Sequence, residues 1–237
     1  EKFREAARRS MDAGYQICEV HGAHGYLLHS FLSPVSNHRQ DAYGGDREGR
    51  MRFPLEVAEV VRDVWPDDLP VFYRISCVDG EGGAWDLDDS VALAKALKDR
   101  DIDLIDCSSG GIKGDSNMPM VPRVPGFQVA FSDRVRRDAG LPTIAVGLII
   151  KPRQAEDILQ TGKADMVALA RELLWHADWP AHAAVELGVA DAYGIMPEEY
   201  AHRLRQREQA KAMPINQGGA ATVAAFERHL GDGVWET

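Results

Sequence analysis

The feature of this sequence that most restricts its fold is a repeated alternation of short apolar segments with longer amphipathic ones. The apolar segments are rich in aliphatic, aromatic and β-branched residues and predict strands at residues 15–20, 71–75, 104–107, 143–146 and 166–169. The amphipathic segments between them predict helices at residues 50–64, 87–99, 131–139 and 152–161. Strands and helices that alternate in this way indicate an α/β protein, in which a parallel sheet of about five strands is covered by helices.

Several helix ends carry recognisable signals. A first helix over residues 1–13 has apolar residues four positions apart and ends at Gly14, a residue common at helix ends. Asp86 precedes the helix at residues 87–99 and is placed to cap it. Pro152 suits the first turn of a helix, where its missing N–H has no intrahelical partner. These signals support the helix positions that the apolar pattern predicts.

Two architectures surround a parallel sheet with helices: a doubly wound sheet and a (β/α)₈ barrel. A doubly wound dinucleotide-binding domain carries a GxGxxG turn after a strand, and this sequence has no such turn. Its chemically distinctive residues instead lie at or after the ends of successive predicted strands, namely His21 and His24, Arg74, Ser108 to Gly111, Gly147, and Ala170 with Arg171. Barrel enzymes concentrate functional residues at this end of their strands, so we predict a barrel of the (β/α)₈ type.

The predicted barrel is incomplete, because about five units cannot close a sheet of eight strands. We expect residues 1–189 to hold its carboxy-terminal units, and we expect three preceding units to lie upstream or to come from a partner chain. Residues 190–237 begin with a highly charged stretch and continue with small, weakly amphipathic residues. We interpret them as a helical extension, in which Trp235 is an aromatic side chain packed on the surface.

Charge and hydropathy exclude several classes of partner. The 237 residues contain 37 acidic and 27 basic side chains, which gives a formal net charge of −10. A chain of this charge is not expected to bind nucleic acid or anionic membrane surfaces. No apolar run reaches the ~18 residues that cross a bilayer. Small molecules are therefore the expected partners.

The three cysteines are separated in the sequence. Cys18, Cys77 and Cys107 each lie inside or at the end of an apolar run, a pattern typical of buried thiols in a reducing compartment. We therefore expect a cytoplasmic location and no redox role for them.

The motif HGAHGY at residues 21–26 is the main candidate for chemistry. Two histidines three positions apart, His21 and His24, can be metal ligands, a hydrogen-bonding pair or core residues. A metal site is disfavoured, because the motif supplies too few ligands and its glycines break the helix on which a HExxH site depends. Two neutral imidazoles beside the phenol of Tyr26 can instead donate hydrogen bonds to a carbonyl oxygen and stabilise it as it gains negative charge.

A longer run that contains this motif carries a family resemblance. Residues 19–53 read EVHGAHGYLLHSFLSPVSNHRQDAYGGDREGRMRF and resemble the signature of the Old Yellow Enzyme family of flavin-dependent ene-reductases, especially the bacterial branch similar to xenobiotic reductase. Shorter segments follow in the same order as in that family: VFYRIS at 71–76, IDCSSGG at 105–111, AVGLI at 145–149 and ADMVALARELL at 164–174. The resemblance covers roughly residues 3–188.

The resemblance implies roles for four of the candidate residues. His21 and His24 match the pair that hydrogen-bonds the substrate carbonyl, and Tyr26 matches the tyrosine that protonates the α-carbon. A packed aromatic after a turn is the alternative for Tyr26. Arg74 matches an arginine beside the pyrimidine edge of the flavin, where a positive charge stabilises the reduced ring. As the alternative, Arg74 is a buried strand residue that requires a salt-bridge partner.

The resemblance also implies a phosphate site for FMN. Gly147, Ala170 and Arg171 match the segment that binds the FMN phosphate after the last two strands. The family usually has glycine where this chain has Ala170, and the added methyl group is expected to crowd a phosphate that approaches the backbone closely.

The implied function is that of an FMN-dependent oxidoreductase with NADPH as the hydride donor. Its expected substrate is an α,β-unsaturated carbonyl or nitro compound, which is reduced at the activated C=C bond. The branch with an iron–sulfur cluster is disfavoured, because the three scattered cysteines cannot ligate one. The alternative function is a non-catalytic half-barrel that pairs with a complementing chain, or with a second copy of itself, and does not hold FMN on its own.

Overall fold

The computed structural model describes residues 1–212, 224–225 and 228–229. Contacts between residues divide the chain into two units, Glu1–Ala177 and Asp178–Thr237. The first unit contains the sheet and every residue of the predicted site, and each unit is described by itself.

Five parallel strands form the sheet of the first unit, and their order in space is their order in the sequence. They are β1 (Cys18–Gly22), β2 (Val71–Ser76), β3 (Leu104–Ser108), β4 (Thr143–Val146) and β5 (Met166–Ala168). Parallel neighbours need a crossover between them, and helices supply it in this fold. The predicted α/β class, with about five consecutive strand–helix units, is confirmed.

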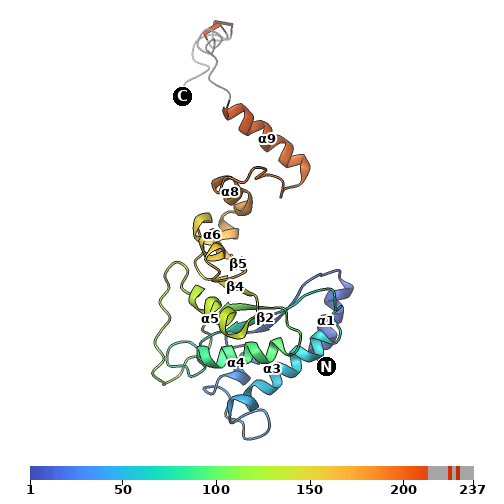
Figure 1. The fold of residues 1–237 in the computed structure, drawn as a ribbon, viewed down its shortest axis with the longest axis vertical. Coiled ribbons are helices and arrows are strands. Elements are labelled where there is room, and N and C mark those ends of the chain that lie inside the picture. Colours follow the sequence, from blue (N-terminus) through green and yellow to red (C-terminus); the bar gives the residue numbers. More distant parts are fainter. Residues whose placement is uncertain (213–223, 226–227, 230–237) are drawn as a thin grey trace. The chain divides into compact units, whose positions relative to one another are not determined.

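The helices of the first unit are α1 (Lys2–Asp12), α2 (Leu27–Leu32), α3 (Arg47–Arg62), α4 (Leu87–Lys98), α5 (Val129–Ala139), α6 (Pro152–Gln160) and α7 (Arg171–Trp175). Helix α1 precedes β1, and the other helices follow the strands in turn. Helix α3 contacts α1, α2 and α4, and α4 contacts α5. Figure 1 shows α3 and α4 side by side along the sheet. Helices α1 to α5 therefore form one continuous layer.

The helix ends follow the sequence signals. The Asp86 side chain accepts hydrogen bonds from the backbone N–H groups of Asp88 and Asp89 and completes a capping box at the start of α4. Pro152 occupies the first turn of α6. Gly140 ends α5 in the left-handed conformation, with φ of 66°.

The two faces of the sheet differ in chemistry, because alternate residues of a strand point to opposite sides. The face toward the helices carries the core, with Val20, Tyr73 and Cys107 all buried. On the other face the register places polar residues side by side, with His21 opposite Arg74 and Arg74 opposite Asp106. The candidate site belongs to this polar face.

The structure corrects two expectations at the start of the sheet. The strand predicted at residues 15–20 begins only at Cys18, and Tyr15 and Ile17 are 65% and 50% exposed. The reason is that Cys18 pairs with Val71, the first residue of β2, so residues before Cys18 have no neighbouring strand there. Helix α2 is not among the helices that the sequence predicts.

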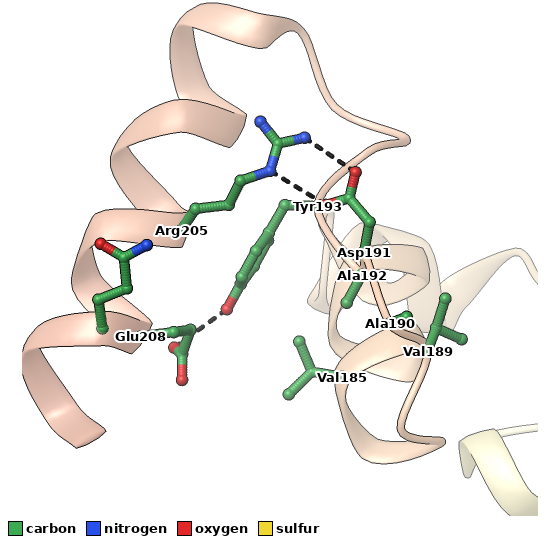
Figure 2. A pocket seen from close by; sticks show the side chains of 9 residues that line it. Val185, Val189, Ala190, Asp191, Ala192, Tyr193, Arg205 and Glu208 are labelled. Carbon is green, nitrogen blue, oxygen red and sulfur yellow. Dashed lines mark hydrogen bonds and ion pairs between the residues drawn. The ribbon is translucent and has the colours of Figure 1, made fainter.

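The second unit has two described helices, α8 (Trp179–Glu186) and α9 (Glu198–Ala212). Arg205 on α9 pairs with Asp191 at 3.0 Å and with Glu198 at 3.0 Å, and the Tyr193 hydroxyl donates to Glu208 at 3.0 Å. Figure 2 shows Arg205, Asp191, Tyr193 and Glu208 between α9 and the segment that follows α8. These four side chains border a cavity of about 490 Å³ whose apolar wall includes Val185.

Two further expectations concern the end of the chain. The predicted division at residues 189/190 falls inside the second unit and stays a prediction. Trp235 lies outside the described residues. In the part of the chain that the structure describes, no helix is long and apolar enough to cross a membrane.

Candidate active site

The site begins at the end of β1, where three rings predicted to act together lie close to one another. The ring of His21 lies 5.3 Å from the ring of His24 and 5.3 Å from the ring of Tyr26, measured between centroids. Tyr26 is 64% exposed and precedes helix α2. The structure therefore brings together the three residues for which the sequence predicts catalysis.

The loop that carries these rings depends on left-handed backbone at two positions. His24 has φ of 58° and Gly25 has φ of 79°. A Cβ at Gly25 would lie 2.8 Å from the carbonyl oxygen of Gly111, and a Cβ at Gly111 would lie 2.1 Å from the backbone of His24. Only glycine permits this close approach between the loops after β1 and β3.

Two serines on the neighbouring strands fix His24. The backbone N–H of His24 donates to Ser76 Oγ at 2.9 Å, and Ser76 Oγ donates to the Gly110 carbonyl at 2.7 Å. The ring atom Nε2 of His24 lies 2.6 Å from Ser108 Oγ. His24 is therefore held through both its backbone and its ring, and Nδ1 is the ring nitrogen not engaged by Ser108.

Both histidines are held in the neutral form. Partial burial lowers the pKa of His21, and the positive charge of Arg74 lowers it further. The same causes, in the same order, lower the pKa of His24 to about 4, with smaller effects from His21 and His29. At neutral pH the two imidazoles are uncharged, which is the form that can donate one hydrogen bond and accept another.

Arg74 has an acidic neighbour on the polar face. Its Nε lies 3.1 Å from Asp106 Oδ2, yet Arg74 Nε and Asp106 Oδ1 are both buried without a hydrogen-bond partner among the described residues. Burial raises the pKa of Asp106, and Arg74 opposes that effect. The salt-bridge partner that the alternative explanation of Arg74 requires is therefore present.

The three residues predicted to bind phosphate line a second hollow, after β4 and β5. The cavity measures about 190 Å³ and is bordered by the segments 146–150 and 168–172, which include Gly147, Ala170 and Arg171. Gly147 has φ of 123°, and a Cβ there would lie 2.9 Å from the Phe127 ring. Ala170 has φ of −118° and ψ of −81°. It therefore does not use the left-handed backbone that favours glycine, although the family usually has glycine at this position.

These features fit a flavin nucleotide in chemistry. The lining of the hollow after β4 and β5 includes Gly147. A larger residue at this position would clash with Phe127 and Gln128. Strands β2 and β3 lie between this hollow and the histidine cluster. Arg74 on β2 supplies a cation there. Within the described residues, no group of three His, Cys, Asp or Glu side chains is placed to hold a metal ion. Cys77 and Cys107 are buried thiols, and Cys18 is partly buried.

The sequence did not reveal the residues that support the site. Gln128 accepts from Ser109 Oγ at 2.6 Å and donates to the Val146 carbonyl at 3.0 Å, which ties the loop after β3 to the end of β4. His29 Nε2 lies 2.8 Å from Asp79 Oδ1, beneath the loop between β1 and α2, hereafter the β1 loop. A usable signal was present only for Ser76 and Ser108, because they lie at strand ends on the polar face.

Comparisons with known proteins identify the family of the chain. Residues 1–189 match the NADH:flavin oxidoreductase / NADH oxidase family. An NADPH dehydrogenase of Geobacillus sp. (strain WCH70) is 48% identical over 197 residues, which is 83% of this chain and 56% of the relative. The chain thus spans about half the length of the curated relatives that it matches.

Two solved structures show the same arrangement of the chain. A 2-naphthoyl-CoA reductase complex aligns with a TM-score of 0.69 at 26% identity, over 78% of this chain and 28% of that chain. Morphinone reductase, also solved in complex with tetrahydroNAD, aligns with a TM-score of 0.61 at 26% identity, over 78% of this chain and 47% of its own. The five strand–helix units are therefore part of a (β/α)₈ barrel, as predicted, and the chain belongs to the NADH:flavin oxidoreductase / NADH oxidase family, the Old Yellow Enzyme family that its signature indicates.

Proposed function

We propose that this chain carries the substrate clamp and phosphate site of an FMN-dependent NADPH oxidoreductase that reduces the activated C=C bond of α,β-unsaturated carbonyl or nitro compounds. The observation that carries the proposal is the pair of neutral imidazoles, His21 and His24, at the end of β1, with the exposed phenol of Tyr26 next to His21. Relatives named NADPH dehydrogenase, and the complex of morphinone reductase with tetrahydroNAD, support a nicotinamide as the reductant.

The histidines have the role of binding and polarising an oxygen of the substrate. A ring N–H of each donates to the carbonyl oxygen, which gains negative charge as the double bond accepts hydride. For His24 the contact with Ser108 decides which nitrogen can act. If Ser108 donates to Nε2, the proton of the neutral ring lies on Nδ1 and is available to the substrate.

Tyr26 has the role of proton donor. Its ring lies 5.3 Å from that of His21, so the phenol is next to a residue that would hold the substrate oxygen. Its exposed position allows the hydroxyl to reach the α-carbon of a bound alkene. The alternative of a packed aromatic is weakened, because a side chain that is 64% exposed packs little of its surface.

The cofactor would be held at two places. Gly147, Ala170 and Arg171 would hold its phosphate in the hollow after β4 and β5, and Arg74 would face the flavin ring. When bound, FMN supplies hydride transfer between the nicotinamide and the alkene. The residues of this chain bind, orient and protonate the substrate around that chemistry.

A second candidate function is a half-barrel that does not hold FMN on its own and acts only with a complementing chain or a second copy. The observation in its favour is that β1, within the described residues, pairs on one side only, with β2. We further propose a cytoplasmic location, which the free thiols of Cys18, Cys77 and Cys107 support.

One experiment separates the two functions. The 237-residue chain is mixed with FMN and desalted, and the retained flavin absorbance is measured. NADPH is then added without oxygen, followed by cyclohexenone. The ene-reductase is supported if the chain retains flavin, NADPH removes the flavin absorbance, and cyclohexenone restores it. Loss of all flavin on desalting supports the half-barrel, and reduced flavin that cyclohexenone does not reoxidise contradicts the proposed substrate class.

A further inference from the structure

We propose that His29 and Asp79 are a positioning pair for the candidate active site, in which His29 accepts a hydrogen bond from the Gly25 amide and thereby places His24 and Tyr26. Only the consequence of this pair for catalysis depends on the proposed function. The contacts themselves can be tested in the absence of flavin and substrate.

Both ring nitrogens of His29 are engaged. The Gly25 N–H donates to His29 Nδ1 at 2.9 Å, and His29 Nε2 lies 2.8 Å from Asp79 Oδ1. Because Nδ1 accepts a hydrogen bond, it carries no proton, and the single proton of the neutral ring must lie on Nε2 and point to Asp79. The side chains of His29 and Asp79 are both fully buried. Neither therefore reaches a ligand, which makes them positioning rather than catalytic residues.

Asp79 is itself fixed by its hydrogen bonds. Besides the bond from His29, its Oδ2 accepts from Ser33 Oγ at 2.6 Å, from the Ala84 N–H at 3.0 Å and from the Trp85 N–H at 2.9 Å. Burial alone would raise the pKa of Asp79, but these hydrogen bonds outweigh it and lower the pKa. The carboxylate thus stays charged and can hold the His29 ring in one orientation and one tautomer.

The β1 loop needs such a support. His24 has φ of 58°, and the left-handed conformation is unfavourable for a residue with a Cβ. It persists where the surroundings fix it, and here the two peptide groups that flank the His24 Cα are each held by a hydrogen bond. Ser76 binds the N–H of His24, and His29 binds the N–H of Gly25. His29 lies on α2, and Tyr26 is the residue directly before that helix. The same hydrogen bond therefore also fixes the position of Tyr26.

Two substitutions of His29 separate its two hydrogen bonds. In His29→Asn, the side-chain oxygen occupies the place of Nδ1 and can still accept from Gly25, while the reach to Asp79 is lost. In His29→Gln, the terminal amide reaches the place of Nε2 and can still donate to Asp79, while the acceptor for Gly25 is lost. Both remove the imidazole, so any direct electrostatic effect of His29 is the same in the two variants.

The readout is the pKa of His24, followed by NMR in the flavin-free chain. The titratable and charged groups that influence it are Arg74 on β2, His21 on β1 and His29 on α2, and in the unaltered chain its pKa is about 4. In His29→Gln we expect the loosened loop to expose His24 and to raise its pKa by about one unit or more. In His29→Asn we expect a clearly smaller rise, because the Gly25 bond survives.

A matched control comes from the same buried network. Ser33→Ala removes a hydrogen bond to Asp79 Oδ2 but leaves the path from Asp79 through His29 to Gly25 intact. We expect this variant to lower thermal stability while the pKa of His24 stays as in the unaltered chain. Equal His24 pKa values in His29→Asn and His29→Gln, or no change in either, would overturn the positioning role.

The flavin-loaded chain gives a second readout that depends on function. We expect His29→Gln to weaken phenol binding by about tenfold or more, since small misplacements of a clamp are costly, and His29→Asn to weaken it less. If the unaltered chain binds no FMN or phenol, the proposed function fails while the His24 titration still decides the positioning role.

If His29→Gln does not fold, hydrogen exchange of the Gly25 amide in the unaltered chain decides. Slow exchange supports the pair, and rapid exchange contradicts it.

Discussion

His21 on β1 lies directly opposite Arg74 on β2. The guanidinium therefore helps to keep the imidazole uncharged, since after burial it is the largest influence that lowers the pKa of His21. The same arginine pairs with Asp106 on the next strand. The register of three strands thus places a neutral donor, a cation and a carboxylate in one row on the polar face.

Replacing both clamp histidines tests the carbonyl-binding role. In the double variant His21→Ala/His24→Ala, we expect phenol binding to the flavin-loaded chain to fall by about a hundredfold, as two hydrogen bonds to a developing charge are removed. FMN retention should change little, because the predicted phosphate site lies after β4 and β5. The exposed His38→Ala serves as the control. Unchanged phenol binding in the double variant would show that the clamp assignment is wrong.

The depressed pKa of His24 predicts a pH dependence of stability. Its folded-state pKa of about 4 is below the ordinary value of 6.5, so between these values the unfolded chain binds more protons. Stability from this group is therefore complete above pH 6.5 and falls as the pH drops toward 4. Asp79, whose pKa is lowered from 3.8, contributes its own loss only at still lower pH.

Urea unfolding at about pH 7, 5.5 and 4.5 measures this effect. The unaltered chain should lose more stability across this range than His24→Asn does, because asparagine does not titrate. Parallel losses in the two proteins would mean that His24 titrates normally in the folded chain.

The conformation of Gly147 predicts a large effect of a single methyl group. A Cβ there meets Phe127 at 2.9 Å and Gln128 at 3.0 Å, at φ of 123°. We expect Gly147→Ala to lower the free energy of unfolding by about 2 kcal/mol or more, since it combines strain with crowding, and to reduce FMN retention on desalting. Gly45→Ala separates the two causes, because Gly45 has φ of 77° and an added Cβ would have no other atom within 4 Å. A similar loss in both variants would attribute the whole effect to backbone strain.

The two explanations of Arg74 can be separated by removing its partner at the same time. Arg74→Met alone leaves Asp106 buried without its cation, and we expect it to cost about 1–3 kcal/mol of stability. In Arg74→Met/Asp106→Asn the buried Asp106 charge is removed together with its cation, so stability should recover to within about 1 kcal/mol of the unaltered chain. FMN retention should nevertheless stay low if the arginine faces the flavin. Full retention in the double variant would leave the salt bridge as the sole role of Arg74.

Periodicity and helix-end signals predicted most of the fold. The strand at Thr143–Val146 and the cap at Asp86 were found because aliphatic residues and a capping aspartate act locally. The start of β1 was misplaced because an apolar residue such as Ile17 becomes strand only where a neighbouring strand is present. That pairing depends on β2, which lies far away in the sequence.

The candidate site likewise has residues that the sequence predicts and residues that it does not. His21, His24 and Tyr26 were found because they form one motif, and the structure brings their rings together. His29 and Asp79 were missed because they lie 50 positions apart and meet only after the strands have paired. Nothing local distinguishes a histidine that orients a loop from one that fills a core.

The mutual contact of Gly25 and Gly111 has a consequence for engineering. Because a side chain on either glycine would enter the backbone of the opposite loop, the two loops are sterically interdependent. Grafting a substrate loop from a relative onto β1 alone would therefore mismatch its counterpart after β3. Libraries aimed at new specificity should exchange the two loops together and keep both glycines fixed, so that diversity falls on positions that face the ligand.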